Sequence, residues 1–70
     1  MKLSNLTDVE QQLDKIRRLA EEKDHQLAHE QQERMYVAVL ELISRDPTDA
    51  QAIAGAALKA EAINFKRWYA

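Results

Sequence analysis

The sequence contains no cysteine and only one glycine and one proline. Without cysteine, the fold cannot use a disulfide or a cysteine-ligated zinc ion, which stabilise many small domains. One glycine and one proline cannot supply the turns of a multi-stranded protein. The chain is instead rich in alanine, leucine, glutamate, glutamine and basic residues, which favour helices. The fold class that we predict is therefore all-α.

Long apolar runs and a net positive charge are also absent. No segment approaches the roughly 20 apolar residues of a membrane span, and the N-terminal residues hold no signal-peptide core. We therefore expect a cytoplasmic protein without a membrane partner. The formal net charge of −2 removes the positive field on which non-specific nucleic-acid binding depends. Nucleic acid is accordingly not the favoured partner.

The length of 70 residues fits one small helical domain over residues 1–70, of which 46% are hydrophobic. Many of the hydrophobic residues are alanines, and a domain of this size buries only about 60% of the surface of its unfolded chain. Domains with such thin cores usually need a disulfide, a metal or a second chain. Because the disulfide is excluded, we expect burial against a partner, and we favour a homodimer.

Thr7 and Glu10 have the spacing of a capping box, which predicts that a helix begins near Asp8. After it, apolar residues recur at three- and four-residue spacing in a stripe as narrow as that of a coiled coil. We call this stripe the N-terminal seam, and it consists of Val9, Leu13, Ile16 and Ala20. So narrow a stripe fits one partner helix, and we expect it to mediate self-association.

Residues 21–34 are acidic and polar and hold only Leu27 and Ala28 as apolar members. No glycine or proline interrupts them, so we expect this stretch to be helical but poorly buried. We favour one continuous first helix over about residues 8–45. The alternative is a break near residues 24–27, with Asp24 as a new N-cap, after which the chain folds back into a three-helix bundle.

The dipeptide Asp46-Pro47 is the strongest punctuation in the chain. Proline restricts the residue before it and is favoured at the first position of a helix. The first helix is therefore predicted to end near Arg45, and a second helix is predicted over about residues 47–68 with Asp46 as its N-cap. The two helices form a helical hairpin, which we expect to dimerise into a helical bundle.

The apolar face of the first helix widens between Met35 and Arg45, where Tyr36 and Leu40 add to the apolar positions. A face this wide predicts two neighbouring helices. The stretch from Tyr36 to Leu58, with VLELISRDPTDAQAIAGAAL at its centre, is similar to the junction between tetratricopeptide repeats. A repeat of about 34 residues needs a second copy, which the sequence lacks. The similarity therefore implies a helical hairpin, and no family is assigned.

Few residues could carry chemistry. Glu22, His25, His29 and Glu33 would share one side of a continuous helix, and two histidines at this spacing can hold zinc. The second half of a helical di-iron site is missing, so we predict no metal ion and no cofactor. The serines and threonines lie at predicted helix ends, where they cap, and form no catalytic set. We predict that the protein is not an enzyme.

The C-terminal segment is a second candidate surface, and it comprises Phe65, Lys66, Arg67, Trp68 and Tyr69. Aromatic and basic residues together suit a protein-binding hot spot and also stacking on nucleic-acid bases. The other interpretation packs Phe65 and Trp68 against the end of the hairpin. We favour a non-enzymatic protein–protein interaction module, or small accessory protein, that self-associates through its helices and has another protein as a further partner. The alternative is a nucleic-acid-associated regulator that uses this basic and aromatic segment.

Overall fold

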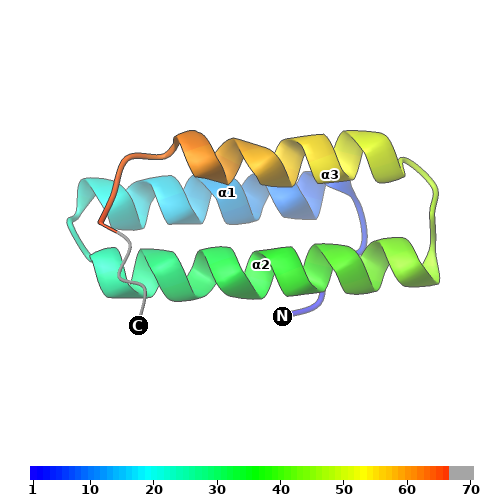
Figure 1. The fold of residues 1–70 in the computed structure, drawn as a ribbon, viewed down its shortest axis with the longest axis horizontal. Coiled ribbons are helices and arrows are strands. Elements are labelled where there is room, and N and C mark those ends of the chain that lie inside the picture. The colour runs from blue at the N-terminus through cyan, green and yellow to red at the C-terminus, as the bar shows by residue number, and fades with distance from the viewer. Residues whose placement is uncertain (67–70) are drawn as a thin grey trace.

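The computed structural model describes residues 1–66, and within these residues it contains helices and no strand. Helix α1 spans Leu6–Glu21, α2 spans His25–Arg45, α3 spans Ala50–Leu58, and a 3-10 turn, η1, follows over Lys59–Ala62. The three helices lie along one another, and each contacts the other two (Figure 1). The all-α prediction is confirmed. The three packed helices correspond to the alternative architecture rather than to the favoured hairpin.

Helix α1 ends in a Schellman motif, the hydrogen-bonding pattern that commonly closes a helix. The Lys23 amide donates to the Ala20 carbonyl at 3.0 Å, and the Asp24 amide donates to the Leu19 carbonyl at 2.9 Å. Lys23 has φ 60°, the left-handed conformation that this motif requires. Glycine is the usual residue here because it adopts this conformation without steric cost. A lysine at this position therefore gives no sign of the turn.

Helix α2 begins directly after this turn, because the Asp24 side chain accepts a hydrogen bond from the Leu27 amide at 3.4 Å. Capping by Asp24 is as the three-helix alternative expected. The turn itself covers residues 22–24, ahead of the expected break at 24–27. The predicted continuous helix over residues 8–45 is therefore wrong. It was inferred from the lack of glycine and proline, and this turn forms without either of them.

The start of α1 also differs from the prediction. Its N-cap is Asn5, whose side-chain oxygen accepts from the Asp8 amide at 2.9 Å. The Asp8 carboxylate in turn accepts from the Ser4 amide at 2.8 Å. Asparagine caps a helix at least as well as threonine does. The predicted capping box of Thr7 and Glu10 therefore lies inside the helix and is not used.

The connection from α2 to α3 is longer than predicted. Helix α2 ends at Arg45 as expected, but α3 begins at Ala50 and ends at Leu58. The Pro47 carbonyl accepts from the Ala50 amide at 3.1 Å and closes a turn. The predicted helix over residues 47–68 is thus too long at both ends within the described chain.

Asp46 stabilises this turn instead of capping α3. Hydrogen bonds from the side chain and the amide of Thr48 lower the pKa of the Asp46 carboxyl below its ordinary value of 3.8, and the amide lies 3.0 Å from Oδ1. Because the folded-state pKa is lowered, this stabilisation is present above pH 3.8 and is lost as the pH falls through the lowered pKa.

We expect an NMR titration of the Asp46 carboxyl carbon to give a midpoint below 3.8. Thr48→Ala should raise that midpoint towards 3.8, because the Thr48 side chain is the largest cause of the shift. A midpoint at or above 3.8 in the wild-type chain would contradict this account of the turn.

The N-terminal seam belongs to the core of the single chain. Val9 and Ile16 have no exposed surface and Leu13 is 2% exposed, while Ala20 is half-buried. Helix α1 packs on α2, α3 and η1. We expected the seam to need a second chain because the long hairpin left it bare. That reason disappears once α1 folds back and the other helices cover it.

Candidate functional site

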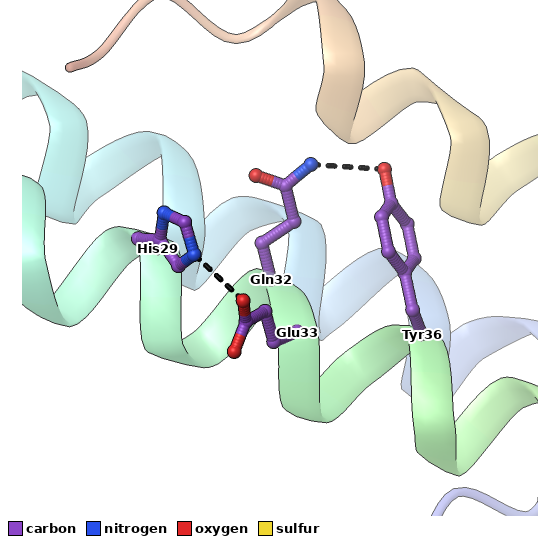
Figure 2. A network of polar contacts seen from close by, with 4 residues as sticks. All are labelled: His29, Gln32, Glu33 and Tyr36. Atoms are coloured by element: carbon purple, nitrogen blue, oxygen red, sulfur yellow. Dashed lines mark hydrogen bonds and ion pairs between the residues drawn. The ribbon is translucent and has the colours of Figure 1, made fainter. Parts of the chain in front are cut away.

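Two adjacent glutamines of α2 are buried in the middle of the bundle. Gln31 is 7% exposed and accepts from the Gln12 side chain of α1 at 2.8 Å. Gln32 is 6% exposed and donates to the Tyr36 hydroxyl at 2.9 Å (Figure 2). No buried side-chain nitrogen or oxygen of the described residues lacks a partner. The Gln12–Gln31 hydrogen bond therefore joins α1 to α2. Most of residues 21–34 are exposed, as predicted, and Ala28, Gln31 and Gln32 are the buried exceptions.

The predicted histidine and glutamate set does not form one group. Glu22 lies in the turn before α2, and the other three residues lie on α2. His25 Nδ1 accepts from the Lys66 amide at 3.2 Å. His29 Nε2 is hydrogen-bonded to Glu33 Oε1 at 2.7 Å (Figure 2). Within residues 1–66, no three histidine, aspartate or glutamate side chains are grouped closely enough to hold a metal ion.

The described part of the C-terminal segment is divided between the core and the surface. Phe65 is 7% exposed and belongs to the hydrophobic cluster. The neighbouring Lys66 is exposed, while its backbone amide donates a hydrogen bond to His25 at the start of α2. The remaining members of the predicted surface, Arg67, Trp68 and Tyr69, lie outside the described residues. The nucleic-acid alternative gains no support from the part of the segment that is described.

Large exposed apolar side chains gather on α2 and α3. Leu40 is 68% exposed, Leu58 is 63% exposed and Val37 is 56% exposed. Leu40 and Leu58 line a groove of about 350 Å³ between the two helices. We call it the α2–α3 groove, and its lining consists of Tyr36, Val39, Leu40, Ile43, Ala54, Ala57 and Leu58. All of these residues are apolar except for the Tyr36 hydroxyl.

The groove is open because α3 covers the apolar face of α2 incompletely. As predicted, that wide face has two neighbouring helices, α1 and α3. Two of the three α3 side chains that line the groove, Ala54 and Ala57, are small. The alanine-rich α3 over Ala50–Leu58 also carries no charged residue. The surface beside the groove is therefore weakly hydrated, and removing it from water is favourable.

The outer face of α1 has the opposite character. It exposes acidic and basic side chains along its whole length, namely Glu10, Asp14, Lys15, Arg17, Arg18 and Glu21. Arg17 and Asp14 form an ion pair there, with 2.9 Å between Nη1 and Oδ1. Charged residues of this kind stay solvated, and they are depleted at the centres of protein interfaces. The groove side is thus the better candidate for an interaction surface.

Comparison with family models, curated proteins and solved structures finds no match to this chain. None of the described helices is long and apolar enough to cross a bilayer. The function has to be inferred from the surfaces of the chain itself.

Proposed function

We propose that the chain is a non-enzymatic interaction module that self-associates through an apolar face on α2 and α3. This face, the α2–α3 face, consists of Val37, Leu40 and Leu58 together with the α2–α3 groove. The proposal rests on one observation: Leu40 and Leu58, both more than half exposed, line the same apolar groove. A single exposed leucine is ordinary, but a contiguous apolar patch is typical of an interaction site.

The energetics support a reversible dimer. Full burial of a leucine or valine contributes about 1.5–3 kcal/mol, and an interface between identical faces buries each side chain in both copies. The gain from Val37, Leu40 and Leu58 in two chains is therefore of the same order as the cost of association, about 4–15 kcal/mol. A second copy also supplies the partner that a thin core of this size calls for.

The test compares Leu40→Glu with the wild-type chain by sedimentation velocity over a range of concentrations. Leu40 is mostly exposed, so its replacement should preserve the helix content of the monomer. Loss of its burial in both copies should weaken the dimer by more than about 100-fold. Gln11→Glu adds a negative charge at an exposed position on α1, on another helix than the face, and is the control.

The expected result is a concentration-dependent dimer for the wild-type chain and the control, and a monomer of unchanged helicity for Leu40→Glu. A wild-type chain that stays monomeric at high micromolar concentration would contradict self-association. A Leu40→Glu variant that still dimerises would show that the α2–α3 face is not the interface.

A further inference from the structure

The outward side of α2 carries a short seven-residue pattern. Glu33, Val37, Leu40 and Ser44 are all exposed and follow one another at spacings of four, three and four residues. This is the spacing of the contact positions in a coiled coil. The two inner positions are apolar and the two outer ones are polar, so the pattern marks a short apolar centre that is closed by polar residues at both ends.

Two opposite charges flank this pattern on the side away from α3. Arg34 follows Glu33 and Glu41 follows Leu40, so the two residues occupy equivalent positions one heptad apart. Both are exposed, and within the described chain neither side chain has a hydrogen-bond or ion-pair partner. Tyr36 and Ile43 flank the pattern on the other side and line the α2–α3 groove.

We infer that two copies of the chain pair through α2 in antiparallel orientation, with Arg34 of each copy beside Glu41 of the other. This inference rests on the proposed function, since it specifies the arrangement of the same interface. Val37 of one copy then packs against Leu40 of the other, and the two-fold axis repeats this contact. The ion pair is likewise formed twice, because the interface is isologous.

The orientation follows from which flanks meet. In an antiparallel pair, each flank of α2 faces the same flank of the other copy, so groove meets groove and the charged flanks meet each other. In a parallel pair, each flank faces the opposite one, which places Arg34 and Glu41 beside Tyr36 and Ile43. Charged groups would then be desolvated next to apolar ones without a partner. The antiparallel pair also brings the two exposed Leu58 side chains to the same side.

Charge reversal tests this arrangement. Arg34→Glu makes the flank of each copy wholly acidic and Glu41→Arg makes it wholly basic, so each variant alone should dimerise about tenfold more weakly than the wild-type chain. An equimolar mixture of the two variants should recover the wild-type affinity as a heterodimer. The variant with both substitutions should recover it as a homodimer. Arg18→Glu on the outer face of α1 is the control and should have no effect.

Sedimentation equilibrium at low salt measures these affinities, and high salt should reduce the differences because exposed charges are screened. Recovery in the mixture supports the antiparallel pair. If both charge variants dimerise like the wild-type chain while Leu40→Glu is monomeric, the interface is correct and the antiparallel arrangement is wrong. If the wild-type chain itself does not dimerise, the proposed function and the arrangement both fail.

Discussion

Ile16→Ala should remove a large part of the stability of the folded chain, because Ile16 has no exposed surface. Truncating a buried isoleucine to alanine costs about 2–5 kcal/mol, since it removes apolar contacts and leaves a cavity. The total stability of a domain of this size is only about 3–10 kcal/mol. Urea denaturation followed by circular dichroism measures the loss. Leu40→Ala, at a mostly exposed position, should change the stability of the monomer by less than about 0.5 kcal/mol.

This comparison also decides where the N-terminal seam is buried. If Ile16 packs within one chain, Ile16→Ala should lower the urea midpoint even at concentrations at which the chain is monomeric. If the seam lies between two chains, the loss appears only where the chain is dimeric. An Ile16→Ala variant as stable as the wild-type monomer would return the seam to its predicted role in self-association.

Phe65→Ala should lower the free energy of unfolding by about 3–5 kcal/mol, the usual cost of removing a buried aromatic ring. Phe65 is 7% exposed, and the backbone amide of Lys66 donates a hydrogen bond to His25 at the start of α2. We therefore expect hydrogen exchange to show faster opening of the first turns of α2, while residues near the α2–α3 turn are affected less.

Phe65→Leu is the matched control, because it retains a large apolar side chain and should lose much less stability than the alanine variant. Equal stability of Phe65→Ala and the wild-type chain would contradict the burial of this ring. In that case the aromatic and basic C-terminal segment would again become a candidate for a binding hot spot.

Local chemistry explains which features could be predicted. The shortage of glycine and proline predicted helices, and Pro47 predicted the end of α2 at Arg45, because proline restricts its neighbour whatever the surroundings. Asp24 is predicted as a cap in the alternative architecture, because a carboxylate accepts hydrogen bonds from the free amides of a first turn wherever a helix begins.

The candidate site shows where sequence patterns stop being sufficient. The wide apolar face of α2 was visible in the sequence, but its pattern does not say which part stays uncovered. That depends on α3, which ends at Leu58 and lines the α2–α3 groove beside it with the small side chains of Ala54 and Ala57. These small side chains let the helices approach but leave Leu40 exposed. The buried Gln31 was missed because its partner, Gln12, lies on another helix.

By itself, the sequence determined that the chain is helical, that α2 ends before Pro47, and which side chains are apolar enough to pack. Only the tertiary structure decided that the chain turns at residues 22–24. A left-handed lysine at position 23 costs about 1–2 kcal/mol locally, so no local preference predicts it. The turn forms because it lets α1 bury Val9, Leu13 and Ile16 within the same chain, and that burial outweighs the local cost.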